Sequence, residues 1–378
     1  MKKFTFNKQF MVLMFLLLNC FASYAADEDL ITKQITIKLT EAGTLPNKIA
    51  SSKKNLVTNL KIIGEINGTD LRFLREMAGR DVNRDFTSGK LSVLDLSEVK
   101  IVEGGGYYYS DYSNSSKNYY TTSNDIIGVS AFEGCISLTS VNIPSSVTEI
   151  GVNAFKYCSS LTSVNIPSSV TEIGGSAFYS CRYLKSVNIP SSVTKIGEEA
   201  FSRCTSLASI SIPSSVTEIG EYAFSTCRSL PRVNIPSSVT DIGSRAFFSC
   251  TSLTSVNIPS SVTSIGDRAF YSCSGLRSVY VYAETPPSIS ANAFNGCDLK
   301  NCTFYIPKGT YDAYWLSEWG NLENIVEFDA TSIHNTVATL KTQETARYAV
   351  NGQRLIVPIK GINLVKYSNG TVKKEFVK

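Results

Sequence analysis

Hydrophobic and polar positions along the chain repeat with a fixed interval of 23 residues between Ile127 and Val281. Leucine keeps this interval from Leu138 to Leu276, and phenylalanine keeps it from Phe132 to Phe270. Cysteine also occurs once per interval, at Cys135, Cys158, Cys181, Cys204, Cys227, Cys250 and Cys273. A fixed period of this length is typical of solenoids, in which each coil buries its apolar side chains against the next coil. We therefore expect a stack of similar coils.

Each coil contains a short strand followed by a proline. In the first clear copy, Val141 and Ile143 alternate with Ser140 and Asn142, which is the two-residue period of a strand with one buried face. Pro144 lacks the backbone N–H that a neighbouring strand would need, so the strand ends there. The same proline recurs in the following coils, which predicts short parallel strands in register.

After the strand, the apolar positions change to a spacing of three or four residues. Ile150, Ala154, Cys158 and Leu161 follow this spacing, and Phe155 lies beside them. The spacing predicts a short helical or 3₁₀ turn on the outer side of each coil. Stacking then places the phenylalanines in one row and the leucines in another, and burial of one such side chain contributes roughly 1.5–3 kcal/mol.

The repeated phrase L-x-S-V-N-I-P-S-S-V-T-E-I-G-x-x-A-F-x-x-C resembles the repeat of the BspA-like leucine-rich repeat family of bacterial surface proteins. The resemblance covers residues 127–281. It implies a right-handed leucine-rich-repeat solenoid, surface display, and adhesion to host proteins or to other cells. Together with the residue pattern, it predicts an α/β solenoid of 23-residue coils with short parallel strands and short helical or 3₁₀ turns, capped at both ends.

Residues 1–25 have the pattern of a signal peptide. Three lysines precede an apolar run over residues 10–18, and Ala25 is a small residue suited to a cleavage site. Cleavage there predicts an exported chain at the cell surface or outside the cell, and no later apolar run reaches the ~20 residues needed to span a membrane. Lipidation at Cys20 is the less favoured alternative, because Asn19 is a poor residue before a lipidated cysteine.

Residues 26–103 are predicted to be an irregular N-terminal part of the same solenoid, covering the apolar end of the first regular coil. L-K-I at residues 60–62 and L-D-L at residues 94–96 are predicted strands. Between them, residues 69–77 have the pattern of an amphipathic helix, for which Thr69 or Asp70 is the expected N-cap.

Residues 104–124 interrupt the repeat and are predicted to form an insertion loop, because Ser, Asn and Gly surround the tyrosines without an apolar period. Tyrosine in a polar loop offers a large contact area and a hydroxyl group, as in adaptable recognition surfaces. The alternative is a tolerated insertion whose tyrosines lie flat on the neighbouring coil. The candidate residues are Tyr107, Tyr108, Tyr109, Tyr112, Tyr119 and Tyr120.

The regular repeats, placed at residues 125–281, are followed by a predicted C-terminal cap at residues 282–328. Its aromatic residues Tyr314, Trp315 and Trp319 are expected to seal the last coil, with carbohydrate stacking as the alternative.

A linker at residues 329–345 and a small β-module at residues 346–378 are predicted to follow the cap. Asn-Gly pairs at residues 351–352 and 369–370 predict two hairpins in this module. Whether the module anchors or sorts the protein stays open.

Buried thiols are the expected state of the cysteine row, because each cysteine follows an inward-pointing Ala-Phe pair by one short turn. An exported chain can form disulfides, and Cys297 and Cys302 are the candidate pair for one. Neither a C-x-x-C motif nor a histidine accompanies the row, so no metal site and no cofactor are expected. The formal charge of +4 falls to +1 without the three leader lysines, which gives no electrostatic case for binding nucleic acid.

The sequence does not predict an enzyme. His334 is the single histidine and lies in the predicted linker, so the repeats have no histidine to activate a nucleophile or to bind a metal ion. A Gly-rich phosphate-binding loop is also missing from the sequence. Acidic residues recur near the turn but are replaced in two coils, and we interpret them as a solvated edge: Glu149, Glu172, Glu218 and Asp241.

The sequence therefore predicts a cell-surface or secreted protein that binds protein partners, such as host extracellular-matrix proteins or other bacterial surface proteins. Binding would use the tyrosine loop and the exposed strand face, whose near-identical side chains suit a repetitive ligand or weak contacts summed by avidity. The alternatives are a structural spacer without a specific ligand and, third, a protein that binds or hydrolyses surface glycans. The candidate strand-face residues are Ser140, Asn142, Ser163, Asn165, Ser186, Asn188, Asn234 and Asn257.

Overall fold

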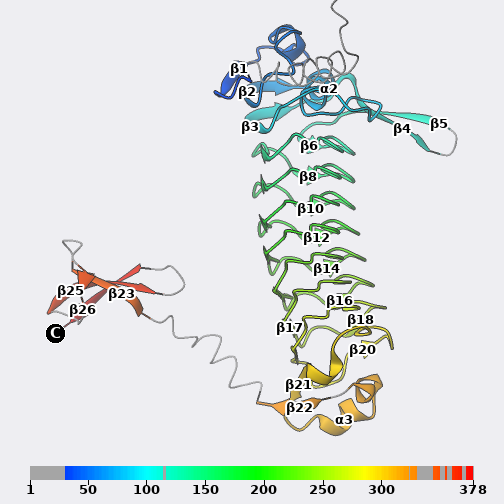
Figure 1. Ribbon diagram of the computed structural model, residues 1–378, viewed down its shortest axis with the longest axis vertical. Helices are drawn as coiled ribbons and strands as arrows, with labels where there is room; N and C mark the ends of the chain where they lie inside the picture. Colours follow the sequence, from blue (N-terminus) through cyan, green and yellow to red (C-terminus); the bar gives the residue numbers. More distant parts are fainter. Residues whose placement is uncertain are drawn as a thin grey trace, which may run out of the picture.

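The computed structural model describes residues 30–113, 116–322, 324–329, 344–349, 354–355, 360–367 and 372–377. The predicted leader with Cys20, and His334 in the predicted linker, lie outside these residues. Up to Phe328 the described chain forms a rod of about 13 stacked turns, and the predicted solenoid of 23-residue coils is confirmed (Figure 1). Within the described part of the chain, no helix is long and apolar enough to cross a membrane.

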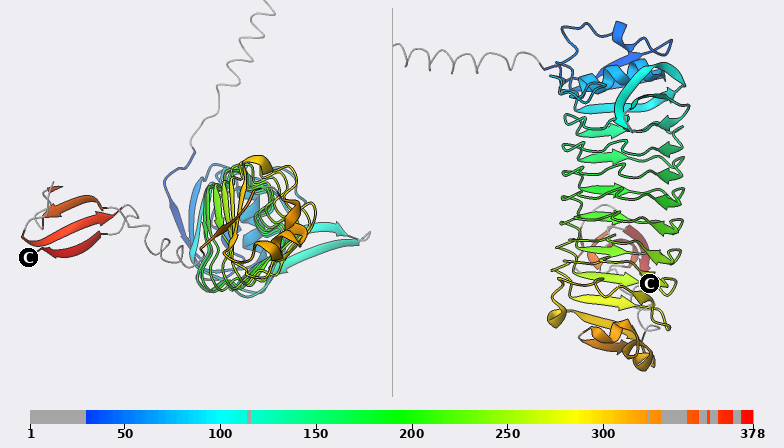
Figure 2. Two further views of the ribbon diagram at one scale, coloured as in Figure 1. Left: turned by 90° about the horizontal axis from the view of Figure 1, so that it is seen from below. Right: turned by 90° about the vertical axis from the view of Figure 1, so that its right-hand side faces the viewer.

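One side of the rod is a column of parallel strands, and the coils superpose when the rod is viewed along its axis (Figure 2). The strands pair in register within three successive sheets, divided before Ser186–Asn188 and before Arg232–Asn234, and Val141 lies between Leu94 of the preceding strand and Val164 of the next. Alternate side chains point into the core, as the two-residue period predicted. In order along the rod, the strands are β1 (Ile35–Lys38), β2 (Asn59–Ile66), β3 (Val93–Ile101), β7 (Ser140–Asn142), β9 (Ser163–Asn165), β11 (Ser186–Asn188), β13 (Ser209–Ser211), β15 (Arg232–Asn234), β17 (Ser255–Ile258), β19 (Ser278–Val281), β21 (Thr303–Pro307) and β22 (Ile325–Phe328).

A second sheet of two-residue strands runs along another side of the rod. Ile150 faces the core in this sheet and pairs with Ile127 and Ile173 of the neighbouring coils. The apolar spacing predicted that a helical turn begins at Ile150, and this prediction is wrong. The strands are β6 (Ile126–Ile127), β8 (Glu149–Ile150), β10 (Glu172–Ile173), β12 (Lys195–Ile196), β14 (Glu218–Ile219), β16 (Asp241–Ile242), β18 (Ser264–Ile265) and β20 (Ser288–Ile289).

Hydrogen-bonded turns replace the predicted helical or 3₁₀ turn between the second sheet and the next strand. Asn153 and Tyr157 have positive φ angles of 58° and 61°, and the equivalent residues of the next five coils have φ between 53° and 61°. A right-handed helix cannot contain such residues. The backbone N–H groups of Asn153, Phe155 and Tyr157 instead donate to carbonyls of the next coil at 2.7–2.9 Å. The chain therefore exchanges hydrogen bonds along the rod axis at this edge as well as in the sheets.

The phenylalanine rings form one continuous stack in the core. Successive rings from Phe132 to Phe294 have centroids 5.2–5.6 Å apart and planes inclined by no more than 10°. The predicted row is confirmed and extends one coil beyond the regular repeat, to Phe294. Each ring between Phe132 and Phe294 is thus packed between the equivalent rings of two neighbouring coils, which no single coil could provide for itself.

The cysteine row is buried beside the phenylalanine stack, as predicted. From Cys158 to Cys273, each thiol of the row donates a weak hydrogen bond to the phenylalanine carbonyl of the preceding coil, and Cys158 Sγ lies 3.0 Å from Phe132 O. Burial raises the pKa of Cys204 to about 12, so the thiol stays protonated near neutral pH. Cys297 and Cys302 are free thiols in the cap, so the candidate disulfide is not formed.

The N-terminal segment closes the first regular coil with a buried arginine. In inner coils, a carbonyl such as Ala154 O accepts the N–H of Phe132 from the preceding coil. The first regular coil has no such neighbour for its own Ala131 O. Arg75 of α2 (Gly68–Met77) takes its place and donates from Nη1 to Ala131 O at 3.0 Å and to Ser130 O at 2.7 Å. The guanidinium thereby supplies donors that another coil would have supplied.

The helix α2 begins after Asn67, which is its N-cap in place of the predicted Thr69 or Asp70. Asn67 Oδ1 accepts the N–H of Thr69 at 3.0 Å, and Asp70 Oδ2 accepts the N–H of Asn67 at 3.0 Å. This reciprocal arrangement is a capping box. Asp70 is buried, and its carboxylate also accepts the N–H of Leu45 at 2.8 Å, at the start of η1 (Leu45–Asn47).

Residues 104–122 form an antiparallel hairpin instead of the predicted loop. β4 (Gly104–Ser113) pairs with β5 (Ser116–Thr122), and the hairpin projects sideways from the N-terminal end of the rod (Figure 1). β4 also packs against α2. The tyrosines and the Ser, Asn and Gly residues around them show no apolar period, so the sequence pattern did not reveal these two strands.

The C-terminal end is closed by buried aromatic side chains, as predicted for Trp319 and Tyr314. The Trp319 ring lies 6.0 Å from Phe294 at the end of the phenylalanine stack, and Trp315 is 55% exposed. Trp319 Nε1 donates to Pro287 O at 2.7 Å, and the Tyr314 hydroxyl donates to Ala283 O at 2.6 Å. The helices of the cap are η2 (Leu299–Asn301), α3 (Tyr311–Trp315) and η3 (Glu318–Asn321).

The described residues beyond 343 form a small antiparallel sheet of their own. The strands on either side of each predicted Asn-Gly turn are paired antiparallel, as two hairpins require. The Asn-Gly residues themselves lie outside the described residues. The strands are β23 (Glu344–Ala349), β24 (Arg354–Leu355), β25 (Gly361–Tyr367) and β26 (Val372–Val377).

We expect the thiols of the cysteine row to be inert in the folded protein. At pH 8, the reagent DTNB should label the partly exposed Cys297 before any buried cysteine of the row, because a protonated and inaccessible thiol does not react. Mass spectrometry of labelled peptides distinguishes the sites, and unfolding in guanidinium chloride provides the fully reactive control. Labelling of Cys204 as fast as Cys297 in the folded state would contradict the burial of the row.

We expect Arg75→Met to destabilise the fold, because methionine fills part of the volume but leaves buried carbonyls without a donor. The free energy of unfolding should fall by roughly 1–3 kcal/mol for each unsatisfied carbonyl. Arg72→Met on the same helix is the matched control, since Arg72 is exposed and pairs with Glu76 at 3.5 Å, an ion pair worth less than about 1 kcal/mol. Chemical denaturation measures both variants, and an equal small effect of the two would argue against the capping role.

Candidate interaction surfaces

The predicted strand-face residues lie in two rows along the first strand column. Their side chains are exposed or partly exposed and remain in register, as the pairing of Asn142 with Asn165 and of Asn234 with Asn257 shows. Because the rows point away from the core, coil packing leaves them accessible to a partner. The residues that the structure brings together in this polar strand face are Ser140, Asn142, Ser163, Asn165, Ser186, Asn188, Asn234 and Asn257.

The strand face changes its chemistry from one end of the rod to the other. At the N-terminal end Lys61 Nζ lies 2.5 Å from Glu98 Oε1 and 3.8 Å from Asp95 Oδ2, and the hydrogen bond to Glu98 raises the pKa of Lys61. The polar rows follow. At the C-terminal end Tyr280 and Tyr305 stack with ring centroids 4.5 Å apart and planes inclined by 8°. A ligand laid along this face would therefore meet charged, then polar, then aromatic groups.

The hairpin buries two of the tyrosines that the sequence offered as binding residues. Tyr108 and Tyr109 are 1% and 3% exposed, and burial raises the pKa of both phenols, that of Tyr109 to about 12. The Tyr108 hydroxyl donates to Val129 O at 2.9 Å. The proposal of a binding role for these two side chains is therefore corrected to a structural role, because Tyr108 bonds to the first coil and the Tyr109 ring packs against the Arg75 guanidinium, 5.2 Å away.

Tyr107 and Tyr119 lie nearer the solvent. Tyr119 is 56% exposed, and its ring meets that of the partly exposed Tyr107 edge-on at 4.7 Å. The Arg72 guanidinium lies 5.5 Å from the Tyr107 ring. Tyr120 is partly buried, with its hydroxyl 3.3 Å from a carboxylate oxygen of the hairpin, and Tyr112 pairs with Lys117 in the strand register.

A third surface, the turn edge, was not anticipated from the sequence. It consists of the two residues after the glycine of each coil and the two residues after its phenylalanine, beginning with Val152, Asn153, Lys156 and Tyr157. Two coils later the same positions hold Glu198, Glu199, Ser202 and Arg203. The coils thus differ from one another mainly here, and comparing the repeats position by position would have found this surface.

Cations and aromatic rings interleave on the turn edge. Lys156 Nζ lies 5.5 Å from the Tyr157 ring and 5.2 Å from the Tyr179 ring of the next coil, and the Arg203 guanidinium lies 5.6 Å from Tyr179 on its other side. Such contacts contribute roughly 0.5–1 kcal/mol each at exposed sites. The turn edge is therefore a partly ordered surface of mixed charge whose residues are specific to each coil.

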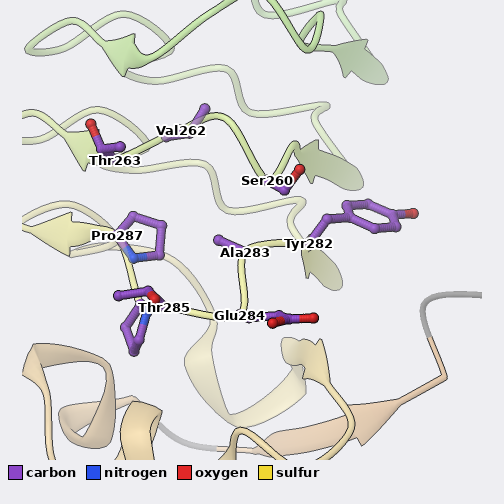
Figure 3. A pocket seen from close by; sticks show the side chains of 9 residues that line it. Ser260, Val262, Thr263, Tyr282, Ala283, Glu284, Thr285 and Pro287 are labelled. Carbon is purple, nitrogen blue, oxygen red and sulfur yellow. The ribbon is translucent and has the colours of Figure 1, made fainter.

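A groove of about 560 Å³ lies between the last regular coil and the C-terminal cap (Figure 3). The loop Tyr282–Pro287 forms one wall, and Ser260, Val262 and Thr263 of the preceding coil form the other. Tyr282 is partly exposed, and its ring meets Phe328 edge-on at 5.5 Å. The groove therefore joins the aromatic end of the strand face.

Acidic side chains give no metal site in the described part of the chain. The column of carboxylates interpreted as a solvated edge is exposed on the second sheet: Glu149, Glu172, Glu218 and Asp241. Among the residues that the structure describes, no three His, Cys, Asp or Glu side chains gather closely enough to hold a metal ion.

The chain belongs to the BspA-type leucine-rich repeat family. The repeat region of that family matches residues 102–230 and 194–322 with six copies, which together cover more than half of the chain. Members of this family are repeat proteins of a non-enzymatic type and are typically associated with the bacterial surface. A search of curated proteins finds no significant match.

Solved structures with similar coils are bacterial leucine-rich repeat proteins. The protein from T. pallidum is 33% identical, over 42% of this chain and 66% of that chain, with a TM-score of 0.30. The protein from Bacteroides ovatus is 26% identical, over 58% and 67% of the two chains, with a TM-score of 0.32. A leucine-rich cell surface protein from Faecalibacterium prausnitzii is 26% identical, over 60% and 88%, with a TM-score of 0.26.

We expect Tyr108→Phe and Tyr119→Phe to differ in stability although both remove one hydroxyl from the same hairpin. Loss of the Tyr108 hydroxyl leaves Val129 O without its donor and should lower the free energy of unfolding by roughly 1–3 kcal/mol. Loss of the exposed Tyr119 hydroxyl should change the free energy of unfolding by less than about 0.5 kcal/mol. Urea denaturation of the two variants measures the difference, and identical midpoints would refute a structural role for Tyr108.

Proposed function

We propose that this protein is exported and acts at the cell surface or outside the cell as a binding protein for other proteins. The family assignment and the pattern of residues 1–25 support export and surface association. Leucine-rich repeat proteins generally bind proteins. Extracellular-matrix proteins of a host and surface proteins of other bacteria are the partners that we propose.

The observation that carries the proposal is the polar strand face, which coil packing leaves accessible. Its serine hydroxyls and asparagine amides recur in most coils at the spacing of neighbouring strands, about 4.8 Å, with Ser211 in place of an asparagine and Arg232 in place of a serine. Each contact to such a surface is weak, but contacts repeated at one spacing add when the partner is itself extended or repetitive. The hairpin that projects sideways from the N-terminal end is a second surface, where the partly exposed Tyr107 and the exposed Tyr119 offer rings that bury large areas.

The proposal is tested with a panel of purified extracellular-matrix proteins immobilised for biolayer interferometry. One variant replaces Asn142, Asn165, Asn188 and Asn234 by Ala, and a second replaces Tyr107 and Tyr119 by Ser. We expect each to lower the affinity for a bound matrix protein about tenfold or more, because hydrogen bonds and aromatic contact area are lost. A variant with alanine in four exposed threonines beside the second sheet is the matched control: Thr171, Thr194, Thr217 and Thr240.

Full affinity in both folded variants would remove the strand face and the hairpin as binding sites. A loss confined to variants of the turn edge, such as Lys156→Ala with Tyr157→Ala, would move the site to that edge.

A structural spacer is the second candidate function, and the uniformity of the coils favours it. The phenylalanine stack keeps almost the same geometry from Phe155 to Phe270, as expected when a rod needs only to be long and regular. Cell fractionation with mass spectrometry of the mature termini locates the protein. Abundant surface protein that retains no partner from matrix or bacterial extracts would favour the spacer.

A further inference from the structure

The groove beside the C-terminal cap lies where one coil is a residue longer than the regular coils. Ser255 pairs with Ser278 at an interval of 23 residues, whereas Ser264 pairs with Ser288 at an interval of 24. The extra residue therefore lies in the loop Tyr282–Pro287, between the two sheets. The loop stays bonded to the preceding coil at its two ends, through Tyr282 N–H to Ile258 O at 3.0 Å and Ser288 N–H to Thr263 O at 2.9 Å, while the two consecutive prolines between them have no N–H to donate.

The cap holds this loop in place from below. The buried Tyr314 hydroxyl donates to Ala283 O at 2.6 Å, and the buried Trp319 Nε1 donates to Pro287 O at 2.7 Å. The two anchored residues flank the segment between them, which includes Glu284. The groove is therefore preformed, and a ligand need not order the loop when it binds.

The groove combines an aromatic wall with polar groups that the fold does not use. Tyr282 and Glu284 project toward the same side (Figure 3). Glu284 is exposed and has no hydrogen bond or ion pair to any residue that the structure describes. The hydroxyls of Ser260 and Thr285 lie on opposite walls of the same groove. No lysine, arginine or histidine is among its lining residues.

The aromatic wall continues beyond the groove along the strand face. Phe328 touches Tyr282 edge-on at 5.5 Å and Tyr280 edge-on at 5.8 Å, and Tyr280 stacks on Tyr305. All four rings are partly exposed. A ligand longer than the groove would therefore find further aromatic surface on the same side of the rod.

We propose that this groove is a binding site for a neutral oligosaccharide. The C–H face of a sugar ring packs on an aromatic ring, and the hydroxyls at its edge donate to the Glu284 carboxylate and share hydrogen bonds with Ser260 and Thr285. Anionic glycans would meet a carboxylate and no cation. A lysine side chain of a protein partner would add little binding free energy by pairing with Glu284, since an exposed ion pair is worth about 0–1 kcal/mol. The site is separate from the protein-binding surfaces proposed above.

The test measures binding of cellotetraose and maltotetraose to the purified chain by isothermal titration calorimetry and saturation-transfer NMR. We expect at least one of them to bind, and Tyr282→Ala and Glu284→Gln each to weaken binding about tenfold, as loss of an aromatic contact or a charge-assisted hydrogen bond implies. Tyr183→Ala and Glu198→Gln replace exposed residues of the same types in other coils, outside the groove. They are the matched controls and should bind normally. Circular dichroism checks that each variant is folded. If Tyr282→Ala unfolds, Glu284→Gln still tests the site, because Glu284 is exposed and its substitution should not disturb the fold.

Three results would overturn the proposal. The first is that neither tetrasaccharide binds. The second is that binding is unchanged in Glu284→Gln, which would place the sugar elsewhere on the rod. The third is that a tetralysine peptide or a heparin tetrasaccharide binds more tightly than the neutral sugars, which would assign the groove to a charged ligand. Binding of proteins to the strand face can succeed or fail independently of all three.

Discussion

The backbone hydrogen bonds that run along the rod axis are the constraint on which the rest of this structure depends. A coil of 23 residues is too short to satisfy its own N–H and C=O groups, so it takes partners from the coil before and the coil after. The identical Phe132, Phe155 and Phe178 positions follow from this exchange, because coils can trade hydrogen bonds only in register. Stacked rings and buried thiols then fill the space that the ladder encloses.

The same constraint explains the two ends. Where the ladder ends, the carbonyls of the terminal coil have no N–H donors from a neighbouring coil. At the first coil, side chains donate to these carbonyls instead. Tyr108 reaches Val129 O and Arg75 reaches Ala131 O. These positions are equivalent to Val152 O and Ala154 O one coil later, which accept backbone N–H groups. At the other end, Trp319 and Tyr314 both close the apolar stack and hold the loop that opens the groove.

The repeat made the fold predictable, because a single period fixed the strand, its proline end and the buried rows together. The turns were less predictable. Their positive φ positions hold residues as different as Asn153, Glu199 and Arg245, with glycine at Gly134 and Gly296 in the end coils, so no recurring glycine marks them, and a strand as short as Glu149–Ile150 leaves no readable alternation. The polar strand face followed from the alternation of Ser140 to Ile143. The groove did not, because its opening depends on where the cap holds the longer loop.

The most direct test of the axial ladder is amide hydrogen exchange followed by NMR at Phe132 and Phe201. Phe132 N–H donates to the second regular coil from the first, and Phe201 N–H makes the equivalent bond in the middle of the rod. If side-chain donors complete the ladder at its end, both amides should exchange equally slowly, with protection that reflects global unfolding. Exchange of Phe132 at the rate of an exposed amide, while Phe201 stays protected, would contradict the claim that the first coil is capped.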